Sequence, residues 1–408
     1  MRPSEADATS PPRYSDAPRP GMGAAVLARD PINGDLADPG RAPRTVEAAP
    51  ESRIAPERGL KVLQRIDDRS PERANRQALD DLARGADGFS LVFQGAPNAF
   101  GHGLPATPEA LEVALRDLPF GRIHLRIDVH PQSRASVDWL VRLLSTRRVA
   151  PERLDVSFGI DPAAAFASSG MLRMSIEALM ASMPQSLAHY FALGVPGILL
   201  EADGRVFHNA GADAALELGA TLSSTTGYLR MFQEARQPAL YAAAHVGFAV
   251  SVEPDRAATA VKLAALGRLW TRLLDSYDVE HLPARIHAET SYRIMSAADP
   301  EANLARAALA ALGAAEAGAS TVAVLPSDTA LRQQDESVRR RERNLLSLML
   351  REAGGTRETM PNSAFAAAVD DLCDAGWEEL RRIEAEGGIL QSLRGGHLQR
   401  RVIAARDA

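Results

Sequence analysis

Histidine is the side chain of this sequence best suited to metal ligation and acid–base chemistry, and the nine histidines are scattered along the chain. None of them forms a His-x-x-x-His or Glu-x-x-His pair, so a metal site would have to be assembled from distant segments. The single cysteine, Cys373, excludes an internal disulfide and a cysteine-based zinc or iron–sulfur site within one chain. We therefore expect no bound metal, and we expect Cys373 to be a small buried apolar side chain.

Three short motifs could serve a cofactor, a phosphate or a nucleic acid, and each has a simpler interpretation. Residues 128–130 (DVH) begin like the Asp-x-His-x-x-Gly signature of cobalamin-binding proteins, but no glycine follows, so we expect a strand end in which Asp128 caps the next turn. Residues 101–103 (GHG) lack the third glycine of a phosphate loop and predict an ordinary flexible loop. The run 339–343 (RRRER) contains and follows acidic residues, which favours a solvated helix face or a salt-bridged partner contact.

Composition narrows the class of protein. The 408 residues carry 46 basic and 52 acidic side chains, a net charge of −6, which gives no field of one sign to attract nucleic acid. No apolar run reaches the roughly 18 to 20 residues of a membrane span. The first residues contain acidic side chains and no apolar signal segment. We expect a cytoplasmic protein that binds neither nucleic acid nor membrane.

The elements that must position any site alternate between short apolar runs and longer amphipathic stretches from Leu60 onward. This pattern is typical of βα units and a parallel sheet. The predicted strands are 89–93, 123–127, 154–158, 197–201, 240–250, 285–289 and 321–325. The predicted helices are 71–84, 107–118, 136–145, 172–181, 212–232, 255–274, 300–317 and 366–386. In the helix 255–274, Lys262 is expected at the solvated rim.

Seven or eight such units over about 290 residues predict a (β/α)8 TIM barrel, with a doubly wound open sheet as the alternative. Residues 1–58 hold ten of the 26 prolines without a hydrophobic period, which predicts an irregular or disordered segment. The barrel is expected over 59–345 and a C-terminal helical extension over 346–408.

Three segments resemble the methylmalonyl-CoA mutase family, in particular its small or β subunit. They are residues 74–91 (ANRQALDDLARGADGFSL), residues 203–230 beginning DGRVFHNAGA, and residues 287–306 beginning HAETSYRIM. The resemblance continues to Val324-Leu325-Pro326 and to residues 377–388, so that it covers roughly residues 59 to 400.

The resemblance implies a (β/α)8 barrel whose active members bind acyl-CoA along the barrel axis beneath a cobalamin. The family's active chains hold the substrate with polar motifs of the types Arg-Gln-Tyr, Tyr-His-x-x-Glu-Ala-Gly-Ala and His-Thr-Asn. Cleavage of the cobalt–carbon bond then starts a radical rearrangement, for which the cofactor supplies the reactivity.

This sequence departs from each of those motifs. Without gaps, residues 63–65 (LQR) align with Arg-Gln-Tyr. Val206 aligns with the family's histidine and Asn209 with its glutamate, so His208 is only a displaced substitute. Val324-Leu325-Pro326 replaces His-Thr-Asn, Arg343-Asn344-Leu345-Leu346 half retains Arg-Asn-Thr-Gln, and residues 360–363 (MPNS) shorten an Asp-Pro-x-Gly-Gly-Ser loop. From the apolar replacements we expect a barrel interior filled by leucine and valine side chains.

The resemblance therefore implies a small, non-catalytic subunit that lacks the family's C-terminal cobalamin domain and pairs with a large catalytic subunit in a heterodimer. We expect no cofactor on this chain, adenosylcobalamin on the partner subunit, and contact with acyl-CoA only through that partner. His208, Asn209, Glu289 and Arg293 are the candidates for a vestigial pocket. Two alternatives stay open: the substrate-binding half of a split acyl-CoA mutase, and an accessory barrel that binds a partner outside any mutase complex.

Overall fold

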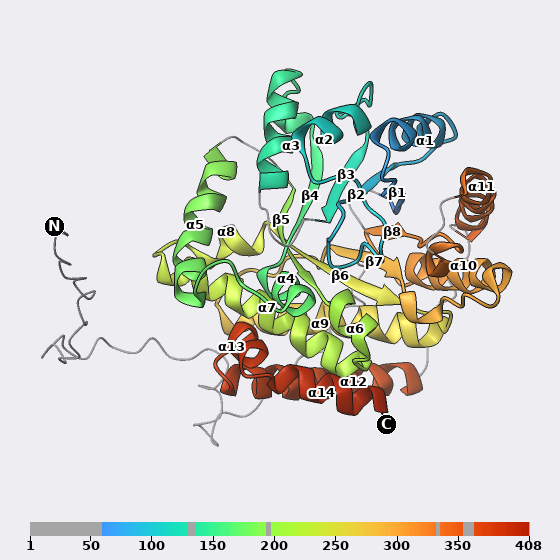
Figure 1. Cartoon of the computed structure of the whole chain (residues 1–408). Coiled ribbons are helices and arrows are strands. Elements are labelled where there is room, and N and C mark those ends of the chain that lie inside the picture. Colours follow the sequence, from blue (N-terminus) through green and yellow to red (C-terminus); the bar gives the residue numbers. More distant parts are fainter. Residues whose placement is uncertain (1–58, 129–134, 193–196, 332–334, 354–362, 408) are drawn as a thin grey trace, which may run out of the picture. The chain divides into compact units, whose positions relative to one another are not determined.

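Eight parallel strands form a closed barrel in the computed structural model, which describes residues 59–128, 135–192, 197–331, 335–353 and 363–407 (Figure 1). Each strand pairs with its neighbours in chain order, and β1 also pairs with β8, through Lys61 beside Thr321. This closure confirms the predicted (β/α)8 barrel and excludes the open sheet. The strands are β1 Lys61–Ile66, β2 Gly88–Val92, β3 His124–Asp128, β4 Asp155–Ile160, β5 Ile198–Asp203, β6 Val246–Val252, β7 Ile286–Thr290 and β8 Thr321–Ala323.

Helices cover the outside of the barrel, and further helices follow it at the C-terminal end of the chain. They are α1 Pro71–Ala83, α2 Pro108–Ala114, α3 Ala135–Thr146, α4 Pro162–Ser169, α5 Ile176–Ala192, α6 Arg205–Ala210, α7 Ala214–Glu234, α8 Ala239–Ala243, α9 Arg256–Ser276, α10 Pro300–Glu316, α11 Glu336–Ala353, α12 Ser363–Ala385, α13 Ile389–Arg394 and α14 His397–Asp407. Short 3-10 turns are η2 Pro151–Arg153, η3 Tyr292–Ile294 and η4 Thr329–Leu331.

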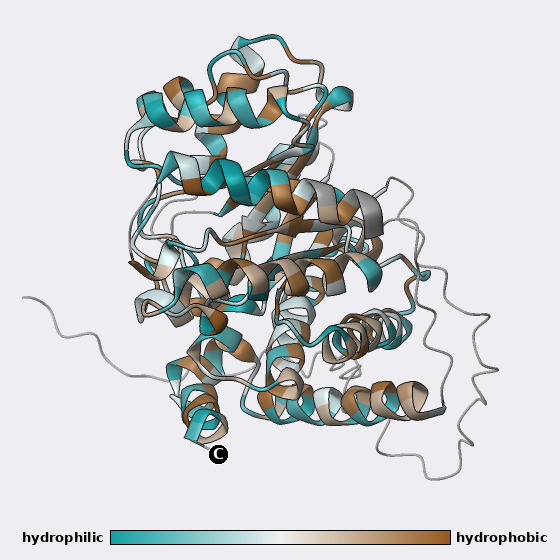
Figure 2. Cartoon of the chain, turned by 90° about the vertical axis from the view of Figure 1, so that its right-hand side faces the viewer, coloured by the Kyte–Doolittle hydropathy of each residue, from teal (hydrophilic) through white to brown (hydrophobic). Residues whose placement is uncertain are grey.

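Several helices begin with the same local chemistry. Ser70, Thr107 and Asp299 each accept a hydrogen bond from a backbone amide in the first turn, and a proline occupies the first helical position after each of them. The helices alternate hydrophilic and hydrophobic residues along their length, as Figure 2 shows, because one stripe of each packs inward. Local capping and periodicity thus explain why these helices were predictable.

The C-terminal helices form a layer against two of the outer helices. α12 packs along α7 and α9, and α14 contacts α6 (Figure 1). Leu380 and Ile383 of α12 are fully buried in this contact layer. The predicted C-terminal helices are therefore present, whereas residues 1–58 and residues 360–362 of the MPNS segment lie outside the described residues.

The structure corrects several predicted elements. β1 was not predicted, and neither were α4 and α6. The predicted strand 240–250 is wrong in its first half, where α8 precedes β6, because an apolar run alone does not distinguish a helix from a strand. The predicted helix 172–181 is displaced, since α5 runs from Ile176 to Ala192.

Within the described residues, no helix is both long and apolar enough to cross a bilayer.

Candidate functional site

Three arginine side chains occupy the interior of the barrel near the carboxyl ends of its strands. Arg65 comes from β1, Arg126 from β3, and Arg205 from the first turn after β5. Their residues are 3%, 1% and 0% exposed, so water does not reach the guanidinium groups. The odd-numbered strands β1 and β3 supply Arg65 and Arg126, while the even-numbered β2 and β4 contribute the small residues Ser90 and Gly159 beside Arg126.

Carboxylates from β3, β5 and β7 pair with the three arginines. Glu289 of β7 is bridged by Arg65 at 2.7 Å and by Arg205 at 3.1 Å. Asp128 of β3 is bridged by Arg205 at 2.6 Å and by Arg126 at 2.8 Å. Arg126 also pairs with Glu201 of β5, and Arg205 pairs with Asp203 at 2.8 Å. We call this set, Arg65, Arg126, Arg205, Asp128, Glu201, Asp203 and Glu289, the axial network.

Pairing with two arginines keeps Asp128 ionised despite its burial. Burial alone would raise the pKa of Asp128, but the charges of Arg126 and Arg205 hold the pKa well below its usual range. The attraction of Glu289 and the aspartates likewise outweighs burial and raises the pKa of Arg205. Buried charges of this kind are tolerated only when each has several partners.

The carboxyl end of the barrel is closed by side chains from a loop and from α11. Asn98, in the loop after β2, donates to Asp203 at 3.0 Å, and its carbonyl accepts from Arg65. Asp67 accepts from Arg65 and from Arg339 of α11, so the network continues to the surface helix. In the same loop, His102 is buried and the backbone amide of Gly103 donates to Asp67. The GHG motif therefore belongs to a loop that covers the barrel.

The prediction of an aliphatic barrel interior is wrong. Buried ion pairs occupy the axis, and Arg65, which aligns with the family's tyrosine, is one of the charges that fill it beside the buried Leu63 on the same face of β1. The interior is polar but occupied, because its arginines and carboxylates contact each other across the barrel.

A second buried cluster surrounds His208 of α6. The Nε2 atom of His208 lies 2.9 Å from the hydroxyl of Ser291, and its Nδ1 atom lies 3.3 Å from Glu217 of α7. Lys262 of α9 donates to Glu217 at 2.7 Å. Burial lowers the pKa of His208, but the neighbouring Glu217 and Glu253 outweigh this effect and raise it.

The Ser291–His208–Glu217 arrangement has the order of a hydrolytic triad, but its environment opposes that chemistry. Ser291 is 0% exposed and its hydroxyl accepts from the backbone amide of Arg293, so it caps the turn η3. A histidine whose pKa is raised is a poor general base near neutral pH. The cluster therefore joins α6 and α7 to the end of β7 through buried polar contacts.

The four candidates for a vestigial pocket divide between these two clusters. Glu289 belongs to the axial network, while His208 lies in the second cluster. Asn209 accepts from the backbone amide of Tyr292, and Arg293 donates to the carbonyl of Ala212 at 3.2 Å. Three of the four thus hold the segment after β7 against α6, and their assignment as a pocket stays a prediction.

Other predicted assignments change once the contacts are known. In the RRRER run, Arg339 pairs with Asp67 and Arg343 with Asp81, both buried, so the run docks α11 on its own barrel. Lys262 is buried in the second cluster and not at a solvated rim.

Asp128 pairs with arginines inside the barrel. The residues that follow it, 129–134, lie outside the described residues, so the predicted capping of the next turn stays a prediction. Cys373 is half-buried, and burial raises the pKa of its thiol to about 11. Among the described residues, no group of three histidine, cysteine or acidic side chains could hold a metal ion.

Sequence reasoning missed most of the axial network. Arg126, Arg205, Glu201 and Asp203 were not singled out, although a signal was present. Charged residues stand at alternate positions in the apolar strands β3 and β5, which places them on one face of each strand.

Comparisons with known proteins agree on one family. The family model described as methylmalonyl-CoA mutase matches residues 104–408. The methylmalonyl-CoA mutase small subunit of Streptomyces virginiae is 32% identical over 375 residues, which are 91% of this chain and 58% of that protein. The small subunit of Propionibacterium freudenreichii subsp. shermanii is 26% identical and is matched over 80% of this chain and 50% of its own length.

A large subunit is also similar. The methylmalonyl-CoA mutase large subunit of Streptomyces virginiae is 28% identical over 227 residues, 54% of this chain and 30% of that protein. The chain spans about half the length of the curated small subunits named above.

Proposed function

Because this chain belongs to the methylmalonyl-CoA mutase family, we propose that it is a small, non-catalytic subunit of a heteromeric, adenosylcobalamin-dependent mutase. In this proposal a large partner subunit binds the cobalamin and the acyl-CoA. The assembly interconverts methylmalonyl-CoA and succinyl-CoA, and this chain stabilises its partner in a cytoplasmic heterodimer.

The axial network is the observation that carries the proposal. The family resemblance implies that active chains bind acyl-CoA along the barrel axis, and here that axis holds three arginines paired with four carboxylates. A substrate entering the barrel would have to displace the guanidinium groups and leave buried carboxylates without cations. That is costly, because breaking a single buried ion pair already destabilises a protein by about 3–5 kcal/mol.

The second cluster supports the same proposal. His208, the displaced substitute for the family's histidine, is engaged by Ser291, Glu217 and Glu253 and is buried. A substrate carbonyl would have to compete with these partners for the imidazole.

The proposal is tested by purifying the chain alone and co-expressed with its large-subunit partner. Size-exclusion chromatography with a cobalamin absorbance spectrum on each fraction locates the cofactor, and a mutase assay locates turnover. We expect corrinoid and activity only in the fractions that contain the partner. Turnover or bound corrinoid with the lone chain would instead favour the split-mutase alternative, and failure to co-purify would favour the accessory barrel.

Two variants within the assembly make the test sharper. Glu289→Gln changes the axial network and His208→Gln changes the second cluster, while Arg84→Gln alters an exposed ion pair as a control. Removing a general acid–base catalyst slows an enzyme by about 100-fold or more. We expect turnover per assembled complex to stay close to that of the control in both variants. A hundredfold loss with assembly intact would show that this chain carries catalytic groups.

A further inference from the structure

A pocket outside the barrel lies between α5, α7 and the turn that joins α12 to α13. Its volume is about 890 Å³, within the range of roughly 300–1,000 Å³ that is usual for small-molecule sites. Apolar side chains form its walls, among them Ile176 and Met180 of α5, Met231 of α7 and Ile389 of α13. These walls could cover a hydrocarbon group of a ligand.

Buried polar side chains form part of the lining, namely Asp161, Ser223, Ser224 and Tyr228. Asp161, which follows β4, is 6% exposed, and its carboxylate accepts from the backbone amides of Ala163 at 2.8 Å and Asp203 at 2.9 Å. Tyr228 is 3% exposed. Its hydroxyl lies close enough to interact with Asp161, but within the described residues it has no partner in good hydrogen-bond geometry. A buried hydroxyl without a partner is costly, so a ligand that pairs with it would be stabilised.

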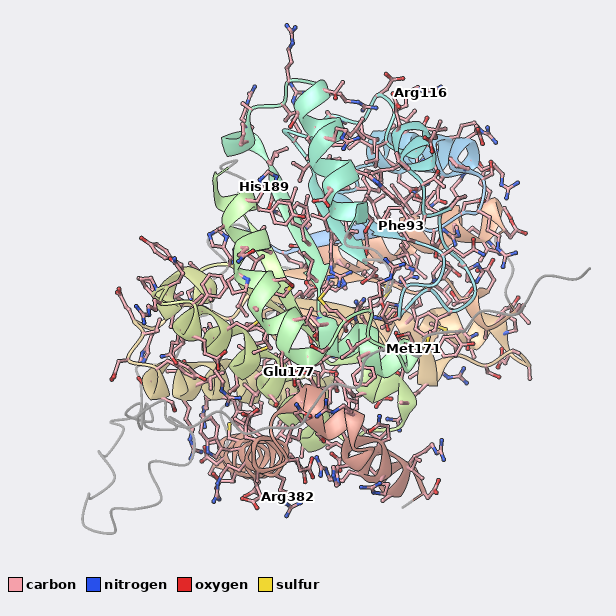
Figure 3. All side chains as sticks on the ribbon, turned by 60° about the vertical axis from the view of Figure 1, so that its left-hand side comes forward. Phe93, Arg116, Met171, Glu177, His189 and Arg382 are labelled. Carbon is pink, nitrogen blue, oxygen red and sulfur yellow. The ribbon has the colours of Figure 1, made fainter. Side chains whose placement is uncertain are left out.

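Negative charge predominates around the pocket. Its lining contains four acidic residues, Asp161, Glu177, Glu234 and Glu384, and one basic residue, Arg230, which is already paired with Glu384 at 2.5 Å. Figure 3 shows Glu177 at the end of α5 that approaches the C-terminal helices. Burial raises the pKa of Asp161 to about 6, as expected for a carboxylate without a compensating cation. Asp161 accepts hydrogen bonds from Ala163, Asp203 and Ser224 but has no ion pair with a cation among the described residues, so a cation placed in the pocket would be attracted to it.

A glycine helps to keep the pocket open. Gly227 lies inside the long helix α7 and lines the pocket, and a Cβ added there would meet no heavy atom within 4 Å. Glycine inside a helix is less favourable than alanine, so its presence is not explained by helix stability. A larger side chain at this position would occupy the cavity.

We propose that this pocket binds a small apolar cation, an alkyl- or arylammonium ion. The hydrocarbon part packs against the methionine and isoleucine walls, and the ammonium group donates to the oxygens of Asp161 and Tyr228. This site lies on the outer helices and does not depend on the function proposed for the barrel.

The test uses the full chain and three probes that share one hydrocarbon skeleton. They are 4-phenylbutylamine, 4-phenylbutanol and 5-phenylpentanoate, which end in a cation, a neutral hydroxyl and an anion. Isothermal titration calorimetry measures their binding to the wild-type chain and to two variants. Gly227→Leu fills the cavity, and Gly227→Ala is the matched control that leaves most of it open.

We expect the amine to bind one site, at least tenfold more tightly than the alcohol, and the carboxylate to show no binding. Binding of the amine should persist in Gly227→Ala and be lost in Gly227→Leu, with both variants folded by circular dichroism. Tyr228→Phe should weaken binding of the amine. Tyr277 lies outside the pocket lining, so Tyr277→Phe should leave that binding unchanged. The proposal is overturned if binding of the amine does not saturate, if the Gly227→Leu chain binds the amine as tightly as the wild type, or if all three probes bind equally tightly.

Discussion

Removing Arg205 should destabilise the chain strongly, because this residue joins three carboxylates of the axial network. It contacts Asp128 at 2.6 Å, Asp203 at 2.8 Å and Glu289 at 3.1 Å. In Arg205→Met, Asp128 and Glu289 each keep one other arginine, whereas Asp203 loses its cation and keeps the side-chain amide of Asn98 and the backbone amide of residue 205. Removal of one member of a buried ion pair costs about 3–5 kcal/mol.

The expected change in melting temperature follows from this free energy. Unfolding entropy is about 2.1 cal/mol/K per residue, which over the roughly 330 described residues gives about 0.7 kcal/mol/K. A loss of about 3–5 kcal/mol then lowers the melting temperature by about 4–7 °C. Arg84→Met is the matched control, since its pair with Asp80 is exposed and surface pairs contribute about 0–1 kcal/mol.

The effect should depend on pH in a defined direction. Burial alone would raise the pKa of Asp128, but Arg126 and Arg205 lower it below the unfolded value of about 3.9. The ion pairs of Asp128 therefore stabilise the fold above that pH, and their stabilisation is lost in more acidic solution. The difference between wild type and Arg205→Met should therefore be full at neutral pH and shrink below about pH 4. Calorimetric melting measures both results. An Arg205→Met chain as stable as the control at neutral pH would refute the assignment of the network as a coupled unit.

Three further changes probe other parts of the fold. Arg343→Met leaves Asp81 buried without its cation. Hydrogen exchange should then show that the amides of α11 lose about 3–5 kcal/mol of protection. Unchanged protection would mean that apolar contacts alone hold this helix. Because the pKa of His208 is raised in the folded chain, the charged imidazole stabilises the fold fully below about pH 6.5, and this stabilisation is lost as the pH rises through the folded-state pKa. His208→Asn should therefore make the melting temperature less dependent on pH between about pH 6 and 9. Melting temperatures of variant and wild type that change with pH in parallel would contradict this. Gly88→Ala places a Cβ 2.1 Å from the carbonyl oxygen of His124, so circular dichroism should show loss of the folded barrel, and near-normal melting would disprove the close approach.

The fold was predictable where local chemistry and periodicity agree. The helices that begin at Pro71 and Pro300 carry a capping residue, a proline and an amphipathic stripe, and both were predicted within a few residues. β1 was missed because its sequence KVLQRI neither alternates polar with apolar residues nor forms an apolar run, and its charged Arg65 is buried inside the barrel. A pattern that assumes apolar residues inside cannot recognise such a strand.

The site was far less predictable, because its contacts join residues distant in sequence. Arg65 and Glu289 are 224 positions apart, and Arg126 and Glu201 are 75 apart. The resemblance identified which polar motifs of the family are missing. Because apolar residues replace some of them, it predicted a barrel interior filled by aliphatic side chains. Only the three-dimensional register shows that arginine and carboxylate side chains fill the axis instead.

The charges of the barrel and the outer pocket are linked through one backbone contact. With Arg339 and Asp67 included, four arginines of the extended axial network face five carboxylates. Asp161 adds a further acid beside it, since its carboxylate accepts from the backbone amide of Asp203. Asp161 and Asp203 thus bring two carboxylates together at the ends of β4 and β5, where Asp161 lines the pocket. Burial of one more carboxylate there is unfavourable unless a cation accompanies it, and Arg230 and Arg205 already pair with Glu384 and Asp203. An ammonium group in the pocket would supply that cation, which is why we expect the charge of the ligand to matter more than the shape of its hydrocarbon part.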